Sequence, residues 1–569
     1  MTITVTKETI LTFTGIAEKN AIVAIFIDGE RKGETTAGEN GKWEWRMAEE
    51  DALGHGEYDI TAQAKDRAGN KSEITQAIKL QIDTELAKPK ITLVHSPDTE
   101  PDVQNHLTNK RPVTFTLNNI DKDVTYIGIT IKNNRGSGEK TIEVRKTGTV
   151  WEVLSNGSVI KNVDLPIKYE NGLWIFTTKD NPLLDGEYTF SVMVKDLAAN
   201  EKTSDLLEVE VDTQPPKAPS IALHEDSHTG LGHFKQQNIT NAKPPQFRLK
   251  DIAEDVTRIL IKMGDSTINA SRKGSNASWV LDPSKASLIK DQHNTGDWIL
   301  TPGQALSHGN HEITVEARDR AGNKSDSSDT LTIEVDIQPP PIPKIEMDGE
   351  SYSNGVNDDN ATKKQQPRFN LICVDGEVER LTLTVFNKKG DNVANVTINK
   401  DAQGQWVLSN DAFTKDEQGN LTFTPKKGWA DDNYTVKVEV WDKANNSANA
   451  QDLKMQVDTV APDAATIVLD SNDGLEGYKN ENLTRQKTPS FTINVANDVD
   501  SVEVSLDGGK SWITLEKQNK TSSLTYITPE LAERTHKLKV RVKDKAGNVN
   551  DSAELSFTLD LTPPGSSNH

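Results

Sequence analysis

The stretch EYDITAQAKDRAGN, residues 57–70, alternates polar and apolar side chains before it ends in a short turn sequence. A second alternating run, AIKLQID at residues 77–83, follows that turn. Period-two alternation with Val, Ile, Thr and Tyr predicts half-buried antiparallel strands, and the Gly supplies the positive φ that the turn needs. The two runs therefore predict a β-hairpin closed by an Asp-x-Ala-Gly-Asn turn.

This turn recurs along the whole chain. Five copies stand at residues 66–70, 196–200, 319–323, 442–446 and 544–548. Successive copies are 130, 123, 123 and 102 residues apart, which is the length of a domain rather than of a solenoid repeat. Ala199 and Asn445 replace the turn Gly. Because Ala does not readily adopt positive φ, we expect a different turn geometry in the second copy.

Two aspartates mark every repeat. The first residue of each turn, here called the turn aspartate, is Asp66, Asp196, Asp319, Asp442 or Asp544. The strand after each turn ends 16 or 17 residues later in a second aspartate, here called the exit aspartate: Asp83, Asp212, Asp336, Asp458 or Asp560. A proline-bearing linker then follows in every case. Because proline cannot continue a β ladder, these linkers are expected to be short, semi-rigid joints.

The repeats predict an all-β fold of five tandem immunoglobulin-like β-sandwich domains in an extended rod. The expected domains are residues 1–84, 85–213, 214–337, 338–459 and 460–569. We expect the extra length of the middle three domains to form an added or lengthened hairpin on one sheet edge. Cys373 is the single cysteine, so no intrachain disulfide can staple these domains.

Composition limits the classes of function. With 34% hydrophobic and 27% charged residues, 36 Gly and 24 Pro, the chain suits small, loop-rich β domains better than large enzymes. A net charge of −21 without a basic run argues against nucleic acid and anionic membranes as partners. The sequence has no membrane-spanning apolar window and no signal-peptide pattern at its start. We expect a soluble, monomeric segment of a longer protein.

The first repeat carries a family pattern most fully, in FTGIAEKNAIVAIFIDG (13–29), GENGKWEW (38–45) and ALGHGEYDITAQAKDRAGNKS (52–72). Together with the fivefold turn, these motifs resemble the tandem bacterial immunoglobulin-like domains of giant type I-secreted, repeats-in-toxin-linked adhesins of the SiiE kind. The resemblance implies a secreted or cell-surface stalk that is joined to neighbouring domains of a parent chain. It also implies roles in attachment, biofilm formation and virulence, with a host-cell glycan or receptor as a partner. The repeats-in-toxin nonapeptide block is absent, so the secretion route rests on the resemblance alone.

The aspartates predict a cation. In such a sandwich the turn lies at the pole where the chain enters, so each turn aspartate faces the preceding exit aspartate. The predicted pairs are Asp83 with Asp196, Asp212 with Asp319, Asp336 with Asp442, and Asp458 with Asp544, while Asp66 and Asp560 form half sites. An acidic loop at the same pole adds Asp121, Asp123, Asp251, Asp255, Asp375, Asp498 and Asp500. Converging carboxylates favour a hard dication, and Ca²⁺ fits such oxygen ligands best.

An alternative remains open for these residues. Both sets of aspartates are also typical of turns and strand ends, where the carboxylate accepts hydrogen bonds from its own backbone. A second acidic loop, with Asp98, Asp102, Asp226 and Asp473, could hold further ions or could be a solvated loop.

Other motifs do not favour an enzyme. Residues 224–228 spell His-Glu-x-x-His, but a zinc protease needs this motif on a helix, and here it follows a strand and precedes Gly230 and Gly232. The alternative function is a lectin-like or receptor-binding module with ligand-binding loops in domains two to four. Exposed tryptophan pairs, Trp43 with Trp45 or Trp429 with Trp441, could then stack on sugars, although core packing is the commoner role.

Overall fold

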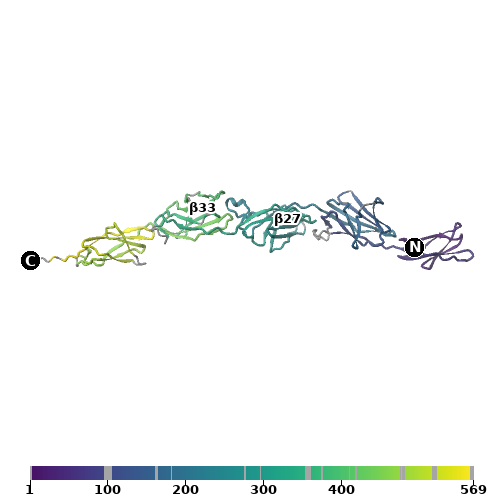
Figure 1. Ribbon diagram of the computed structural model, residues 1–569, viewed down its shortest axis with the longest axis horizontal. Helices are drawn as coiled ribbons and strands as arrows, with labels where there is room; N and C mark the ends of the chain where they lie inside the picture. Colours follow the sequence, from purple (N-terminus) through teal and green to yellow (C-terminus); the bar gives the residue numbers. More distant parts are fainter. Residues whose placement is uncertain are drawn as a thin grey trace. The chain divides into compact units, whose positions relative to one another are not determined.

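The computed structural model describes residues 3–94, 106–136, 138–160, 164–180, 182–273, 277–294, 296–352, 360–372, 374, 376–408, 411–416, 420–474, 476, 478, 481–515, 522–563 and 565. Asp98, Asp102, Cys373 and Asp375 lie outside these residues. Figure 1 shows a chain of strands and loops. The described helical segments are three short 3₁₀ turns, η1 (Glu49–Asp51), η2 (Glu225–Ser227) and η3 (Gly232–Gln236).

The chain forms two compact units. The first contains Met1–Ile221, Leu249–Leu300 and Ile313–Thr330, and the second contains Ala222–Arg248, Thr301–Glu312 and Leu331–His569. For reference, the strands are grouped in chain order into sets 1 to 5.

Set 1 forms two sheets in the first unit, one in the order β1-β7-β6-β3-β4 and the other of β2 with β5. Its strands are β1 (Thr4–Thr6), β2 (Thr12–Ile16), β3 (Ile22–Ile27), β4 (Glu30–Thr36), β5 (Lys42–Arg46), β6 (Gly56–Lys65) and β7 (Ile78–Ile82). β1 runs parallel to β7, whereas the other pairs are antiparallel.

Set 2 also lies in the first unit and forms two sheets, β15-β16-β10-β8 and β14-β13-β12-β11-β17-β19-β9, with β18 paired to β17. Its strands are β8 (Lys90–Leu93), β9 (Leu107–Thr108), β10 (Thr114–Asn118), β11 (Tyr126–Asn133), β12 (Glu139–Thr147), β13 (Val150–Ser155), β14 (Ser158–Ile160), β15 (Ile167–Glu170), β16 (Leu173–Thr177), β17 (Gly186–Lys195), β18 (Glu201–Thr203) and β19 (Leu207–Val211). The β12–β14 strands are the predicted extra hairpin on a sheet edge.

Set 3 is shared between the two units, which are described separately. Its strands are β20 (Ser220–Leu223), β21 (Ile239–Thr240), β22 (Phe247–Lys250), β23 (Val256–Met263), β24 (Ser266–Ser271), β25 (Ala286–Lys290), β26 (Trp298–Pro302), β27 (Gly309–Asp319) and β28 (Leu331–Val335). In the first unit β23 pairs antiparallel with β24 and with β27. In the second unit β21 runs parallel to β28.

Set 4 lies in the second unit and forms the sheets β29-β31-β36-β35 and β30-β39-β37-β32-β33-β34, with β38 paired to β37. Its strands are β29 (Lys344–Met347), β30 (Ala361–Thr362), β31 (Phe369–Ile372), β32 (Val378–Asn387), β33 (Asn392–Lys400), β34 (Trp406–Val407), β35 (Phe413–Lys415), β36 (Leu421–Phe423), β37 (Asp432–Asp442), β38 (Ser447–Asn449) and β39 (Leu453–Val457). β34 extends the sheet edge beyond β33, again as the extra length predicts.

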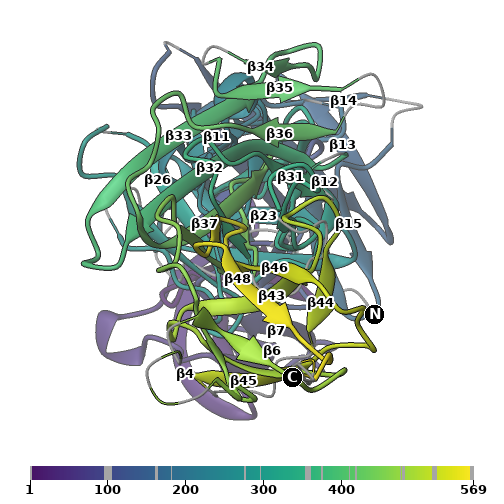
Figure 2. The same ribbon diagram turned by 90° about the vertical axis from the view of Figure 1, so that its left-hand side faces the viewer.

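Set 5 completes the second unit with the sheets β40-β42-β45 and β41-β48-β46-β43-β44, with β47 paired to β46. Its strands are β40 (Thr466–Leu469), β41 (Leu483–Thr484), β42 (Ser490–Asn494), β43 (Val499–Ser505), β44 (Ile513–Leu515), β45 (Ser523–Ile527), β46 (Thr535–Asp544), β47 (Val549–Asp551) and β48 (Leu555–Leu559). In Figure 2 the strands β43, β46 and β48 carry the yellow and green colours of the C-terminal part.

Side-chain alternation explains the sheets. Along β17 the side chains of Phe190, Val192 and Val194 are fully buried, while the residues between them are partly exposed. These side chains meet Phe115 and Phe176 of the facing sheet in one core. Burying a side chain of this size stabilises the fold by about 1.5–3 kcal/mol, and the other sets repeat the pattern. The predicted all-β class and tandem immunoglobulin-like fold are confirmed, whereas the five domain boundaries stay a prediction.

Candidate functional site

The Asp-x-Ala-Gly-Asn turns follow the strands β6, β17, β27, β37 and β46 and share one hydrogen-bond pattern. In the copy at Asp319, one carboxylate oxygen accepts from the Asn323 N–H at 2.8 Å and the other accepts from Asn323 Nδ2 at 2.9 Å. The same two bonds recur in the other four turns. The motif therefore builds a rigid turn whose last residue, here called the closing asparagine, holds the turn aspartate.

The expected change of geometry at Ala199 is wrong. Ala199 has a φ of 65°, in the same left-handed region as Asn445 at 71° and Gly322 at 90°. The bonds between Asp196 and Asn200 persist around Ala199, and Lys7 Nζ donates to the Ala199 carbonyl at 2.9 Å. These contacts impose the turn although an Ala in this region costs roughly 1–2 kcal/mol.

Four of the closing asparagines also contact an exit aspartate. Each donates from the same Nδ2 to the main-chain carbonyl of the preceding exit aspartate at 2.7–2.9 Å. We call these contacts bridge 1 (Asp83, Asp196, Asn200), bridge 2 (Asp212, Asp319, Asn323), bridge 3 (Asp336, Asp442, Asn446) and bridge 4 (Asp458, Asp544, Asn548). The four predicted pairs of exit and turn aspartates are thus brought together. The asparagine that joins them was missed at the sequence level, where it was interpreted only as a turn residue.

Bridge 1 gathers three carboxylates. Ligand oxygens of Asp83, Asp123 and Asp196 lie within 4.8 Å of one another, and this is the one such acidic group among the residues that the structure describes. Asp83 and Asp196 are buried, with 4% and 3% of their surfaces exposed, whereas Asp123 is exposed. His55 Nδ1 lies 3.4 Å from an oxygen of Asp83. Two like charges are therefore buried side by side, with a third at the rim.

Bridges 2 to 4 place a loop carboxylate one residue from the contact. Val256, Val378 and Val499 pair directly with the turn aspartates Asp319, Asp442 and Asp544. Asp255, Glu377 and Asp498 precede these valines as Asp123 precedes Val124, and Asp500 follows Val499. Glu377 was missed from the sequence, although its position before a buried valine was the available signal.

Two of the predicted loop aspartates contact the linker rather than a bridge. Asp121 accepts a hydrogen bond from the Ala87 N–H at 2.7 Å. Asp251 forms an ion pair with Lys217 at 3.4 Å and accepts from the Ser220 hydroxyl at 3.3 Å. These carboxylates hold the segment that follows an exit aspartate and are not grouped with the turn aspartate.

The end residues Asp66 and Asp560 have local partners. Asp66 accepts both bonds from Asn70, and Asp560 accepts one from the Thr562 N–H at 3.1 Å. The other exit aspartates make the same short-range bond to the N–H two residues ahead. Every aspartate of the repeat thus also serves a local turn, as the alternative interpretation expects. A carboxylate oxygen that accepts one hydrogen bond still has a free lone pair.

Burial and neighbouring charge oppose ionisation of the turn aspartates at bridges 2 and 3. Burial raises the pKa of Asp319 despite its bonds to Asn323, and the charge of Asp212 raises it further. Burial likewise raises the pKa of Asp442, with a further contribution from Asp336. At Asp66, opposite which the described residues place no exit aspartate, the Asn70 bonds lower the pKa of the carboxyl group. The turn at Asp66 therefore favours the ionised carboxylate, whereas enclosure at bridges 2 and 3 disfavours it.

Basic side chains accompany the bridges in two ways. At bridges 2 and 3 an ion pair crosses to the strand before the exit aspartate, Arg320 with Glu210 and Lys443 with Glu334, both at 2.6 Å. At bridge 4 Lys363 Nζ donates to the Gly547 carbonyl at 3.0 Å, as Lys7 does at bridge 1. Partly exposed ion pairs of this kind contribute about 0–1 kcal/mol each, so they supplement the bridges rather than replace them.

The donor set of bridge 1 fits Ca²⁺. The oxygens come from the three carboxylates, which is ligand chemistry that calcium takes. The site offers no sulfur and no lysine or arginine ion pair among the described residues. Buried carboxylates without a cationic partner are costly unless they are protonated or a cation neutralises them.

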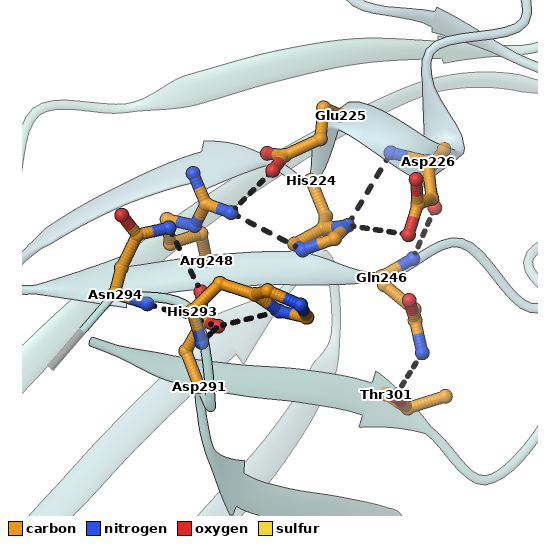
Figure 3. A network of polar contacts seen from close by, with 10 residues as sticks. His224, Glu225, Asp226, Gln246, Arg248, Asp291, His293, Asn294 and Thr301 are labelled. Atoms are coloured by element: carbon orange, nitrogen blue, oxygen red, sulfur yellow. Dashed lines mark hydrogen bonds and ion pairs between the residues drawn. The ribbon is translucent and has the colours of Figure 1, made fainter.

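The His-Glu-x-x-His motif does not form a metal site. Figure 3 shows His224 between Arg248 and Asp226. His224 Nε2 lies 3.3 Å from Arg248 Nη2, and His224 Nδ1 lies 3.6 Å from a carboxylate oxygen of Asp226. The same Arg248 nitrogen also pairs with Glu225 at 2.7 Å. The segment is the 3₁₀ turn η2, and His228 instead contacts the Gln237 carbonyl at 3.1 Å. The two histidines therefore do not share a helix face.

Other acidic and aromatic candidates are occupied locally. Asp473 accepts from the Arg485 N–H at 3.1 Å within its own loop. Asp291, which the sequence did not single out, accepts from the N–H groups of His293 and Asn294 in Figure 3. Trp429 is buried and packs against Phe369 and Tyr434, so it offers no free ring to a sugar.

The fold and the repeated bridges define a tandem array of immunoglobulin-like β-sandwich domains. The chain belongs to the bacterial Ig-like domain family, whose model matches residues 3–84, 144–213, 215–293, 285–337, 339–414, 409–459 and 462–561. The fold and the recognised family agree, whereas the more specific likeness to SiiE-type adhesins remains an interpretation of the sequence.

Several solved structures are similar to the chain. One is a tetra-tandem repeat from the extending region of a large adhesion protein, with 15% sequence identity and a TM-score of 0.28. The match covers 84% of this chain and 100% of that chain. A Ca²⁺-stabilised adhesin with which an Antarctic bacterium binds ice has 15% identity and a TM-score of 0.29, covering 80% and 96%. The BSP domain of a biofilm-associated protein has 11% identity and a TM-score of 0.19, covering 84% and 97%.

Similarity at this level carries no argument about function. No curated protein matches the chain. Among the described residues there is also no helix with the length and hydrophobicity needed to cross a bilayer.

Proposed function

We propose that the chain is a non-enzymatic stalk segment of a secreted bacterial surface adhesin, stiffened by calcium bound at its aspartate pairs. The observation that carries this proposal is the recurrence of the bridge. Four times along the chain one asparagine joins the carbonyl of an exit aspartate to the carboxylate of a turn aspartate. A contact repeated at every joint between repeats suits a mechanical role, because a substrate site would be needed only once.

Calcium is the proposed cation because the bridges bury acidic groups. Asp196, Asp319, Asp442 and Asp544 are each 2–3% exposed, and the asparagine that holds each of them also binds the carbonyl of an exit aspartate. Bound calcium would supply the positive charge that cancels their repulsion. Asp83, Asp123 and Asp196 would hold it at bridge 1, and the exit and turn aspartates, with Asp255, Glu377 or Asp498, would do so at bridges 2 to 4. Extracellular modules of this kind bind calcium at roughly 10⁻⁴–10⁻³ M.

Two kinds of group would then restrict the motion of each joint. The closing asparagine and the linker prolines restrict each joint without the ion, and the carboxylates add a restriction that depends on it. Tandem repeats of this family are linked to adjacent domains of a larger chain. A stalk of this kind would hold a binding region of the parent protein, for a host glycan or receptor, away from the cell.

Calcium titration of matched variants tests the proposal. We expect Asp196→Asn to remove binding at bridge 1, so that calorimetry in metal-free buffer reports one site fewer or an affinity about tenfold lower there. Asp66→Asn is the matched control, because Asp66 makes the same turn bonds but faces no exit aspartate. Circular dichroism checks that both variants fold.

The outcome distinguishes the two roles of the aspartates. If Asp196→Asn and Asp66→Asn bind calcium like the unaltered chain, the aspartates are turn residues only and the calcium proposal fails. Trp429 is buried and is therefore not part of a sugar-binding face.

A further inference from the structure

The strand that leads into each Asp-x-Ala-Gly-Asn turn begins at a corner of the same construction. In set 2 the Tyr188 hydroxyl donates to the Leu184 carbonyl, four residues earlier, at 3.1 Å. A tyrosine or histidine ring makes the same contact in the other four sets. The residue that follows the contacted carbonyl is here called the corner residue, and it is His55, Asp185, His308, Asp431 or Glu533. The corner residue is therefore acidic in sets 2, 4 and 5 and a histidine in sets 1 and 3.

The acidic corner residues hold the linker. Asp431 accepts from the N–H of Thr459 at 3.0 Å and from its hydroxyl at 2.9 Å. Asp185 accepts the same two bonds from Thr213, each at 2.9 Å, and a third from Gln214 Nε2 at 3.0 Å. Thr213 and Thr459 are the first linker residues after their exit aspartates. The corner carboxylate thus fixes the point where the chain leaves one repeat for the next.

Glu533 repeats this arrangement at the end of set 5. Its carboxylate accepts from the N–H groups of Leu561 and Thr562, each at 3.1 Å, and from the Thr562 hydroxyl at 2.6 Å. These bonds, led by that of the hydroxyl, lower the pKa of Glu533. At Asp185 burial raises the pKa, but the bonds from the linker and the charge of Arg111 lower it overall. The corner carboxylates are therefore ionised, which makes them strong acceptors.

The histidine corner residues contact the exit aspartate instead. His55 Nδ1 lies 3.4 Å from a carboxylate oxygen of Asp83. In set 3, His308 Nδ1 lies 3.3 Å from a carboxylate oxygen of Asp336. Both of these exit aspartates are buried, whereas those of bridges 2 and 4 are partly exposed. The corner residue, its partner and the burial of the exit aspartate thus divide the bridges into two classes, 1 and 3 against 2 and 4.

The two classes hold the linker by different groups. At bridges 2 and 4 the corner carboxylate is separate from the paired exit and turn aspartates, so its bonds to the linker do not depend on an ion there. At bridges 1 and 3 the first linker residues are Thr84 and Ile337, and Ile337 has no hydroxyl to donate. Because the corner histidines contact the exit aspartates, the linker is held there through carboxylates that are themselves proposed calcium ligands.

We propose that Asp185 and Asp431 are linker clamps that order bridges 2 and 4 without a metal ion, so that clamped and unclamped joints alternate along the chain. Bridges 1 and 3 are then the joints whose order depends on calcium, and this second part rests on the function proposed above. A fall in calcium would loosen every second joint, while the joints between them keep their linkers in place.

Hydrogen exchange of the full chain tests the clamps. The amides of the first linker residues, Thr84, Thr213, Ile337 and Thr459, are followed by mass spectrometry with single-residue fragmentation, in chelator and then in a few millimolar calcium. In chelator we expect Thr213 and Thr459 to exchange about tenfold more slowly than the other two, relative to intrinsic rates, because their N–H groups donate to the clamp. Calcium should slow Thr84 and Ile337 and change the clamped amides by less than about twofold.

Substitutions at the corner residue remove or install a clamp. Asp431→Ala should speed exchange of the Thr459 amide in chelator by about tenfold, whereas His308→Ala, the matched change at bridge 3, should leave the linker amide there unchanged. His55→Asp supplies a carboxylate where Thr84 already has the hydroxyl that a clamp uses, so it should slow exchange of the Thr84 amide by a similar factor. Exchange of the β6, β27 and β37 amides checks that the variants fold.

The two parts of the proposal fail separately. Equal exchange of all four linker amides in chelator, or exchange of Thr459 that Asp431→Ala does not change, would overturn the clamps. Clamped amides that are protected in chelator, together with Thr84 and Ile337 amides that calcium does not slow, would support the clamps and refute the dependence of bridges 1 and 3 on calcium.

Discussion

The closing asparagine is the residue on which each joint depends. Its single Nδ2 group donates to two oxygens, one from its own turn aspartate and one from the preceding exit aspartate. Since Asn323 and Asn548 are buried, these bonds form away from competing water. The side chain therefore converts a local turn into a link between two repeats.

Ala199 carries a measurable strain. We predict that Ala199→Gly raises the free energy of unfolding by about 0.5–1 kcal/mol, because Gly adopts the observed φ of 65° without a Cβ penalty. Urea denaturation of the full chain measures the change in the transition that reports set 2. Ala198→Gly is the control and should destabilise, since Ala198 is buried and is not among the residues with positive φ. An equal loss of stability in both variants would mean that the turn is unstrained.

At the scale of secondary-structure elements, the hairpins were predictable and the joints only in part. Period-two alternation around DRAGN identified β6, β7 and their equivalents, because strand period and turn chemistry are local properties of the chain. The pairing of exit with turn aspartates followed from sandwich topology. Asp251 was assigned to the cation and instead pairs with Lys217, because two residues of similar chemistry in one loop cannot be told apart without their partners.

The bridges should contribute stability that the isolated turn does not. We predict that Asn548→Ala costs about 1–3 kcal/mol in the unfolding of set 5, because it removes the Nδ2 donor from one oxygen of the buried Asp544 carboxylate and from the Asp458 carbonyl, while the backbone N–H of residue 548 still serves the other Asp544 oxygen. Asn70→Ala removes the equivalent turn bond, but no exit aspartate lies opposite, so its effect should be under about 1 kcal/mol. Denaturant titrations of both variants measure the difference. A loss at Asn70 as large as that at Asn548 would show that the turn, not the bridge, carries the stability.

Over the whole molecule, the bridges form a series of similar joints. Each bridge uses two aspartates and one asparagine in a fixed order, while the accompanying groups differ: a lysine donates to a carbonyl at bridges 1 and 4, and an ion pair forms at bridges 2 and 3. The pairs of exit and turn aspartates could be predicted from the sequence, because the motif that contains them recurs in every repeat. The unequal loop acids, such as Glu377 in place of an aspartate, required the register of Val378 with Asp442 to be recognised.

Small-angle X-ray scattering of the full chain, with a few millimolar calcium and again with chelator, tests whether calcium stiffens the stalk. Five domains held in line would span roughly 200 Å with a radius of gyration of about 58 Å, against about 25 Å for a compact chain of 569 residues. We predict the larger value with calcium, and a smaller, broader distribution with chelator. A scattering curve that is the same in both conditions would contradict calcium stiffening, and a compact particle would contradict the stalk itself.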